Sequence, residues 1–174
     1  MLLLTGAPGV GKTATAQILA ARRDRSAHVK ADLFLDFIES GFVEPWKPEC
    51  REQNPVVMRA IADAAAAYAA GGYFTVVDGI ILPGWFLEPL RDSLSDAGHP
   101  VAYAVLRAPL GVCAARAASR GTQPLADPQV VERLWQDFAD LGPREANAID
   151  IGEGSADEAT GLLEHRLRDG SLAV

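Results

Sequence analysis

The chain is poor in cysteine, histidine and lysine. Its 174 residues hold two cysteines, three histidines and three lysines. Cys50 and Cys113 have no spacing that is typical of a metal site or of a disulfide framework. Cys113 lies in an alanine-rich stretch, which predicts a small buried apolar residue. The histidines also lack a metal-binding spacing, so we expect structural or exposed positions for His28, His99 and His165.

Long apolar runs and an excess of basic charge are also missing. No apolar run approaches the ~20 residues of a membrane helix, and the first run ends at Leu4, which is too short for a signal peptide. We therefore expect a cytoplasmic protein without membrane contact, whose mature chain begins at Met1. The formal net charge is −7 and the arginines are scattered, which argues against a nucleic-acid partner. An acidic chain that binds phosphate must do so through a local binding motif, because its overall charge repels the anion.

The rest of the composition indicates one ordinary globular domain over residues 1–174. Hydrophobic residues make up 49% of the chain and charged residues 22%, and the length suffices for a real core. Strands are expected at residues 2–4, 27–31, 73–77, 101–106 and 148–151. Helices are expected at residues 11–23, 33–39, 56–70, 84–97, 109–119 and 129–140, and after Ser155 as an N-cap. This alternation predicts an α/β protein with a parallel sheet that is covered on both faces.

One of the three lysines follows a glycine-rich turn at the end of the first expected strand. Residues 6–13 read GAPGVGKT, which matches G-x-x-x-x-G-K-[ST] between a strand and a helix. Glycine allows backbone N–H groups to converge on phosphate oxygens, and the helix start adds partial positive charge. The motif predicts a site for the phosphates of a nucleoside triphosphate, formed by Gly6, Ala7, Pro8, Gly9, Val10, Gly11, Lys12, Thr13 and Ala14.

Two side chains of this region and one aspartate have separate expected roles. Lys12 is expected to reach the β- and γ-phosphates, and the Thr13 hydroxyl to ligate Mg²⁺. Asp78 follows the apolar strand 73–77, as a Walker B aspartate does, and is the second expected Mg²⁺ residue, directly or through water. The alternative is that Asp78 and Gly79 simply form a turn.

A second aspartate follows the second expected strand. In doubly wound sheets ligands gather at the carboxyl ends of the strands. Asp32 stands at such an end, where it would accept the proton of a substrate hydroxyl and orient the oxygen toward the γ-phosphate. The alternative is that Asp32 is only the N-cap of the next helix.

Two arginines precede a loop rich in glycine and proline. Arg116 and Arg120 are four residues apart and therefore share a helix face. We expect residues 120–128 to form a short lid, with one guanidinium against a purine ring and the other on the transferring phosphoryl group. The alternative is a solvated helix end with a favourable dipole interaction.

Taken together, these motifs resemble the small P-loop kinases. The resemblance rests on GAPGVGKT, Asp32, the VVDG segment that contains Asp78, and Arg116-x-x-x-Arg120 before a short lid. It is nearest to the chloramphenicol phosphotransferase-like group, and the wider group includes nucleoside monophosphate, shikimate and gluconate kinases. It implies a five-stranded parallel sheet in the order 2-3-1-4-5, with ATP and Mg²⁺ as cofactors and Asp32 as the base. It also implies that the loop at 152–157, with Gly154 and Ser155, lies near the adenine.

The chain departs from the monophosphate kinases between the second and third strands. Those kinases use several arginines there to grip the acceptor phosphate, whereas this chain offers only Arg51 and Arg59. The region and the segment after the third strand are instead rich in aromatic residues: Phe34, Phe37, Phe42, Trp46, Trp85 and Phe86. These predict a pocket for a neutral or partly apolar acceptor, with ordinary core packing as the alternative.

The sequence therefore predicts an ATP-dependent phosphotransferase that moves the γ-phosphate to a hydroxyl of a small molecule, either a metabolite or an antibiotic. Its predicted catalytic residues are Lys12, Asp32, Arg116 and Arg120. Two alternatives stay open, namely a nucleoside or nucleotide kinase and an ATP-binding protein that sequesters a ligand or switches a partner. The acceptor and the choice of ATP over GTP are not fixed by the motifs, and both a monomer and a homodimer are compatible with them.

Overall fold

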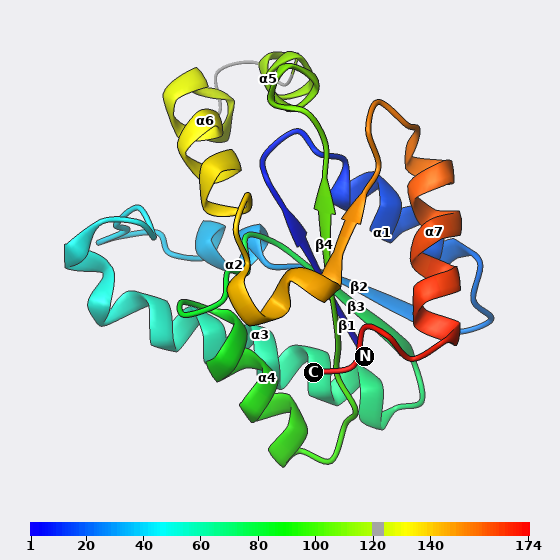
Figure 1. Ribbon diagram of the computed structural model, residues 1–174. Coiled ribbons are helices and arrows are strands. Elements are labelled where there is room, and N and C mark those ends of the chain that lie inside the picture. Colours follow the sequence, from blue (N-terminus) through cyan, green and yellow to red (C-terminus); the bar gives the residue numbers. More distant parts are fainter. Residues whose placement is uncertain (120–123) are drawn as a thin grey trace.

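Five parallel strands form one sheet at the centre of the molecule (Figure 1). The computed structural model describes residues 1–119 and 124–174. The sheet order is β2-β3-β1-β4-β5, and all four neighbouring pairs are parallel. The strands are β1 (Leu2–Gly6), β2 (Ser26–Lys30), β3 (Phe74–Asp78), β4 (Ala102–Arg107) and β5 (Ala148–Asp150). Both the predicted α/β class and the strand order are confirmed.

Helices cover both faces of this sheet. The helix α1 (Lys12–Ala21) packs beside α7 (Ala156–Arg168) on one face, and α3 (Gln53–Ala70) packs beside α4 (Leu87–Asp96) on the other (Figure 1). None of the helices within the described ranges is long and apolar enough to cross a membrane. The remaining helical elements are α2 (Asp32–Asp36), η1 (Pro48–Arg51), α5 (Leu110–Ala118), η2 (Pro124–Ala126), α6 (Pro128–Asp137) and η3 (Gly142–Asn147).

The central strand is apolar because it is buried on both faces. Leu2, Leu3 and Leu4 are fully buried, as expected for a strand with helices on either side. Strand β1 pairs with β3 and with β4, so that Leu3 lies between Val77 and Tyr103. The buried leucines therefore fix β1 in the middle of the core, and the loop that follows Gly6 emerges at the carboxyl edge of the sheet.

Several helix boundaries differ from the sequence prediction, and three of them have a clear local cause or a large effect on length. The helix expected at 56–70 begins at Gln53, because Pro55 falls in the first helical turn, where a missing N–H does no harm. The helix expected at 84–97 begins at Leu87, since the amides of residues 85–87 all bond to the carbonyl oxygen of Leu82 in a turn. The helix expected at 33–39 is shorter, Asp32–Asp36. Ser155 is the N-cap of α7, as predicted, and forms a capping box with Glu158.

Candidate functional site

The loop between β1 and α1 has a backbone that only glycine can adopt at its key positions. Gly6, Gly9 and Gly11 have φ angles of 144°, 80° and 105°. A Cβ atom at Gly9 would overlap the carbonyl oxygen of Cys113 at the start of α5, and one at Gly6 would overlap the carbonyl oxygen of Leu106. The loop is therefore fixed by direct contact with β4 and α5 as well as by its own conformation.

This contact predicts a difference between two glycines with the same backbone conformation. Gly98, after α4, has φ 81°, and a Cβ there would meet nothing within 4 Å. We expect Gly98→Ala to lower the free energy of unfolding by about 1 kcal/mol, from backbone strain alone. Gly9→Ala adds a steric overlap, which costs about 1–3 kcal/mol more. Urea denaturation measures both variants, and equal losses would contradict the packing described here.

Lys12 and Thr13 begin α1 directly after this loop. Gly11 is the N-cap and provides no side-chain hydrogen bond, so the first N–H groups of α1 have no cap from their own chain segment. The Lys12 side chain is only 5% exposed, which holds its charge at the loop rather than in solvent. The start of α1 thus presents backbone amides and a buried cation together, which is the arrangement that an anionic phosphate group requires.

Asp78 lies at the end of β3 and is brought together with Thr13. It is 3% exposed, and burial by itself would raise its pKa. Hydrogen bonding to His28 and Thr13 and the charges of His28 and Lys12 outweigh burial and leave the pKa of Asp78 below its usual value. His28 Nε2 lies 3.0 Å from Asp78 Oδ1, and this contact is an ion pair when the imidazole is protonated. A side chain that only formed a turn would not be buried against a cation, so the geometry favours the functional interpretation.

Sequence reasoning gave His28 no part in the site. It lies on β2, where Lys30 pairs with Asp78, so His28 is two residues away along the neighbouring strand. The strand order 2-3-1-4-5 already places β2 beside β3. The pairing register, which brings His28 close to Asp78, could not be obtained from the sequence. No three His, Cys, Asp or Glu residues cluster as metal ligands anywhere in the described ranges. A cation at Thr13 and Asp78 would therefore take its other oxygen ligands from phosphates and water.

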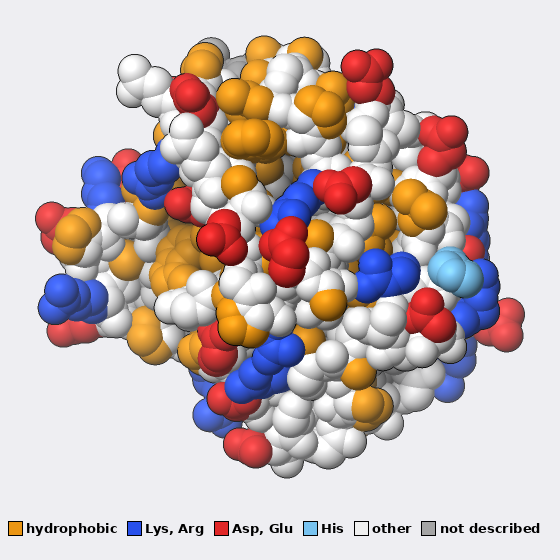
Figure 2. All heavy atoms as spheres, in the orientation of Figure 1, with side chains coloured by type: hydrophobic (Ala, Val, Ile, Leu, Met, Phe, Trp, Pro, Cys, Tyr) orange, Lys and Arg blue, Asp and Glu red, His pale blue; other side chains and the backbone are white. Residues whose placement is uncertain are grey.

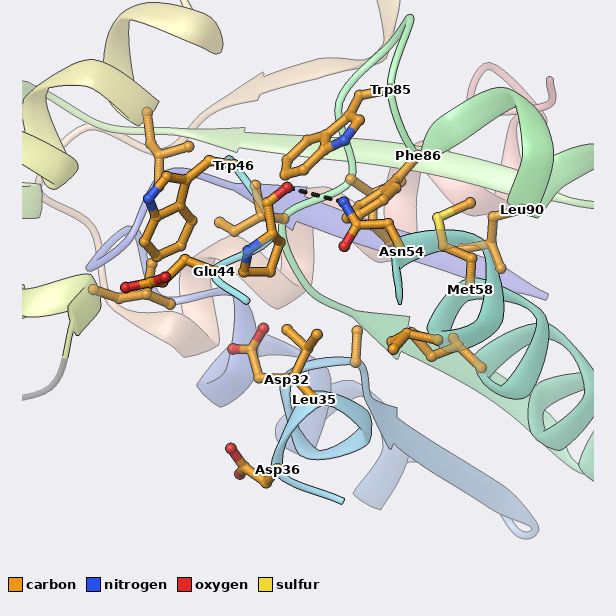
Figure 3. Close-up of a pocket in the computed structure, with 18 of the residues that line it drawn as sticks. Asp32, Leu35, Asp36, Glu44, Trp46, Asn54, Met58, Trp85, Phe86 and Leu90 are labelled. Carbon is orange, nitrogen blue, oxygen red and sulfur yellow. Dashed lines mark hydrogen bonds between the residues drawn. The ribbon is translucent and has the colours of Figure 1, made fainter. Parts of the chain in front are cut away.

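Asp32 is the first residue of α2, next along the sheet edge. The N-cap of α2 is Ala31, so the alternative interpretation of Asp32 as an N-cap is wrong. Its exposed side chain lines a cavity of about 400 Å³ (Figure 3). The structure thus places a carboxylate in the wall of a hollow that can hold a small molecule. Its role as a base stays a prediction.

Arg116 connects two loops of the site. Its guanidinium donates to the carbonyl oxygens of Glu153 and Gly154, at 3.2 and 3.1 Å, and to that of Val10 at 3.5 Å. Arg116 is therefore not simply a solvated helix end, and Gly154 does lie beside it. Ser155 uses both its hydroxyl and its backbone N–H in the capping box of α7. The contacts of Arg116 and Gly154 with a nucleotide stay predictions.

Part of the predicted lid lies outside the described residues. This part comprises residues 120–123. It includes Arg120, which we expected to share the catalytic role of Arg116. The described remainder contains η2, and Leu125 of η2 lines the cavity together with Leu134 of α6. The described part of the expected lid therefore contributes to the cavity wall through Leu125.

The cavity is lined mainly by apolar side chains. Of the six aromatic residues predicted for it, four line it, namely Phe42, Trp46, Trp85 and Phe86. Figure 2 shows hydrophobic side chains gathered in a hollow to the left of the centre of this face, beside acidic ones. The other two do not line it. Phe34 of α2 and Phe37, the residue after α2, form an edge-to-face pair, and Phe37 is 73% exposed. For these two residues the pocket prediction was wrong.

The polar residues of the cavity are acidic or neutral. They are Asp32, Asp36, Glu44 and Asn54, and no lysine, arginine or histidine in the described part of the chain joins them. Glu44 forms an ion pair with Lys47 at 2.8 Å on the rim. Of the arginines considered for an acceptor phosphate, Arg59 is bound to Asp63, and Arg51 lines a separate hollow. Within the described residues, the wall of this cavity therefore offers no charge complement to an anionic acceptor.

The cavity floor is tied to two strands through Ile81. Its backbone N–H donates to the Thr5 hydroxyl of β1 at 2.9 Å, and its carbonyl oxygen accepts from the Tyr103 hydroxyl of β4 at 2.8 Å. Burial raises the pKa of Tyr103, so its hydroxyl stays protonated as a donor at all ordinary pH values. These bonds hold the segment that follows Asp78 and forms the cavity floor.

We expect Tyr103→Phe to lower the free energy of unfolding by about 1–2 kcal/mol, because it leaves the buried carbonyl oxygen of Ile81 unpaired. Urea denaturation measures the change. Tyr68→Phe is the matched control, since Tyr68 is 49% exposed, and it is expected to change stability by less than about 0.5 kcal/mol. Equal effects of the two substitutions would show that the Tyr103 hydroxyl does not anchor the floor.

Comparisons with known proteins agree with this geometry. A family model described as an AAA domain matches residues 1–141. Among curated proteins, none matches the sequence. A sugar kinase from a Janibacter species superposes with a TM-score of 0.67 at 19% identity, covering 98% of this chain and 94% of that chain.

Two further solved structures have the same fold. A tunicamycin resistance protein from Deinococcus radiodurans has a TM-score of 0.69 at 20% identity, with 99% and 97% of the two chains covered. Shikimate kinase from Acinetobacter baumannii, in complex with shikimate, has a TM-score of 0.66 at 20% identity, with 97% and 93% covered. The likeness to small P-loop kinases is thereby confirmed at the level of the fold.

Proposed function

Because this chain belongs to the AAA domain family and has the fold of small P-loop kinases, we propose that it is an ATP-dependent kinase that phosphorylates a hydroxyl group of a small molecule. The observation that supports this most strongly is the juxtaposition of three features at one sheet edge. These are the glycine loop with buried Lys12, the Thr13–Asp78 pair, and a largely apolar cavity with Asp32 in its wall. Each corresponds to one part that phosphoryl transfer needs.

The donor side of the site fits the triphosphate and its metal. The amides of the loop and of the start of α1 bind the phosphate oxygens, and Lys12 neutralises charge on the β- and γ-phosphates. Thr13 and Asp78 would hold Mg²⁺, because the buried aspartate has a lowered pKa and thus remains an anionic oxygen ligand. Mg²⁺ supplies further neutralisation of the phosphate charge when it is bound. Arg116 and the loop at Gly154 border the nucleotide side.

The acceptor side supplies a base and a site that excludes water. Asp32 takes the proton of the acceptor hydroxyl as the oxygen forms a bond to the γ-phosphorus. The bond from the γ-phosphorus to the bridging oxygen breaks, and that oxygen leaves with the electron pair as part of ADP. The products are ADP, a phosphate monoester of the acceptor, and one proton released from Asp32. Trp46, Trp85 and Phe86 surround the acceptor and keep water from competing as the nucleophile.

The lining of the cavity favours an uncharged or cationic acceptor over an anionic one. Three carboxylates line it, and the described residues bring no positive charge into it. A carboxylate or phosphate on the acceptor would therefore be repelled and desolvated without a partner. The predicted preference for a neutral or partly apolar alcohol agrees with this lining.

Acceptor-dependent release of ADP tests this function. The protein is incubated with Mg-ATP and, separately, with neutral alcohols, amino alcohols, sugar acids and nucleoside monophosphates. We expect members of the first two classes to accelerate ADP release and the two anionic classes to leave it at the basal rate. Strong stimulation by monophosphates would instead identify a nucleotide kinase. Nucleotide binding without stimulation by any class would identify a non-catalytic binding protein.

A further inference from the structure

A buried amide in the cavity wall has one of its polar atoms unused. Asn54 lies in the first turn of α3 and is 7% exposed. Its Nδ2 donates to the carbonyl oxygen of Pro45 at 2.9 Å and to Cys50 Sγ at 3.0 Å. Because the Pro45 carbonyl can only accept, the amino group must face it, and this fixes the orientation of the amide. Oδ1 is buried, and no group in the described part of the chain bonds to it.

Such an atom needs an explanation. Leaving a buried acceptor without a partner costs about 1–3 kcal/mol, and native proteins pair nearly all such groups. The contacts of Nδ2 explain half of the side chain, since they hold the segment from Pro45 to Cys50 against α3. They leave Oδ1 unexplained, because all of these contacts are made by Nδ2.

The surroundings of Asn54 indicate what would pair with it. Figure 3 shows its amide pointing from α3 toward the middle of the cavity, with Trp85 and Phe86 on one side and Met58 and Leu90 on the other. All four neighbours are apolar or aromatic. A single hydrogen bond in such surroundings discriminates strongly between ligands, because a ligand without the donor leaves the acceptor desolvated and unpaired.

Asp32 and Asn54 come from different elements of the cavity wall, α2 and α3. On the basis of the proposed function, we propose that Asn54 determines acceptor specificity. Its Oδ1 accepts a hydrogen bond from an N–H or O–H group on the apolar body of the acceptor, while the reacting hydroxyl lies at Asp32. The acceptor class is thus an apolar alcohol with a second hydrogen-bond donor and no negative charge.

Matched pairs of probes test this assignment without turnover. Each pair consists of an N-acetylated aromatic amino alcohol, such as N-acetylphenylalaninol or N-acetyltryptophanol, and its N-methyl derivative, which lacks the N–H donor. Binding is followed through the fluorescence of the protein for the phenyl probes, since Trp46 and Trp85 line the cavity, and by calorimetry for the indole probes. Mg²⁺ and a non-hydrolysable ATP analogue are present throughout. We expect the donor-bearing member to bind at least about tenfold more tightly to the wild-type protein.

Three variants separate recognition from structural support. Asn54→Leu removes Oδ1, so the preference within a pair should fall below about twofold. Asn54→Asp loses the donor to Pro45 but keeps an acceptor oxygen, and Cys50→Ala disturbs the same contacts from a residue that does not line the cavity. Both are expected to keep the preference. Thermal denaturation of each variant confirms that it is folded before binding is compared.

Several results would overturn the assignment of Asn54. These are equal binding of both members of every pair, failure of every donor-bearing probe to bind, survival of the preference in Asn54→Leu, and its loss in Cys50→Ala. The proposed function fails separately. If the protein discriminates within the pairs but transfers no phosphoryl group to any alcohol, the recognition role of Asn54 stands and the proposed kinase activity is wrong.

Discussion

Lys12→Met is expected to lower the kcat of phosphoryl transfer by about 100- to 1,000-fold. Methionine keeps the aliphatic stem of a side chain that is 5% exposed, so the substitution removes the charge and little of the packing. The loss is large because Lys12 acts where charge develops on the transferring group, and the buried loop gives solvent little opportunity to replace it. Steady-state kinetics at saturating acceptor measure kcat, and calorimetry measures ATP affinity.

Lys47 provides the control for this substitution. It is an exposed lysine that pairs with Glu44 on the rim of the cavity. We expect Lys47→Met to leave ATP affinity and kcat within about twofold of the wild type, as is usual for an exposed pair. If Lys12→Met retained activity within about tenfold while remaining folded, the loop of residues 6–13 would not be the site of the transferring phosphate.

Asp32→Asn is expected to lower kcat by about 100- to 10,000-fold while leaving ATP affinity unchanged. The amide has the same shape as the carboxylate, but it cannot take the proton of the acceptor hydroxyl. Binding of ATP depends on the glycine loop and α1, which Asp32 does not form. Comparison of kcat from initial rates with ATP affinity from calorimetry therefore separates the two sides of the site.

The matched control for Asp32 is one helical turn away. Asp36 lies on the same helix and also lines the cavity, so Asp36→Asn removes the same charge from the same wall. We expect Asp36→Asn to change kcat by less than about threefold, because Asp32 and not Asp36 takes the proton in the proposed reaction. Equal losses of kcat in the two variants would show that the negative charge of the cavity wall matters, and that Asp32 is not a specific base. Unchanged biological activity of Asp32→Asn, with loss in Lys12→Met, would indicate a switch protein.

Local patterns in the sequence were sufficient to predict the structure around the glycine loop. The run Leu2–Leu4 followed by GAPGVGKT predicts a buried strand, a tight turn and a helix, and each is set by residues adjacent in the chain. The position of Asp78 at the end of a buried strand was predicted for the same reason, because it ends an apolar run. Strand order depends on pairing between distant segments, and it came from the resemblance to P-loop kinases rather than from local pattern.

The features that the sequence did not reveal depend on contacts between distant elements. His28 contacts Asp78 only because β2 and β3 pair in one particular register. Arg116 bonds to carbonyl oxygens of two loops, and no sequence pattern marks a carbonyl as a partner. Asn54 belongs to no motif, and its unpaired oxygen is visible only once the segment at Pro45 has folded onto α3.

The aromatic residues show the limit of composition as a guide. Six of them were grouped because they are close along the sequence or follow neighbouring strands, and four do line the cavity. Phe34 and Phe37 do not line it, because α2 is a short helix on which only some positions face the cavity. Composition therefore predicted the apolar character of the pocket correctly, but the side-chain direction on α2 required the structure.

Mass spectrometry of the reaction products tests the central claim most directly. The protein is incubated with Mg-ATP and a library of hydroxyl-bearing metabolites and antibiotics that includes neutral, cationic and anionic members. We predict a product heavier by one phosphoryl group from an uncharged or cationic alcohol, formed together with an equal amount of ADP and absent with Lys12→Met. Phosphorylation confined to anionic members, or ADP formed without any phosphorylated product, would contradict the account.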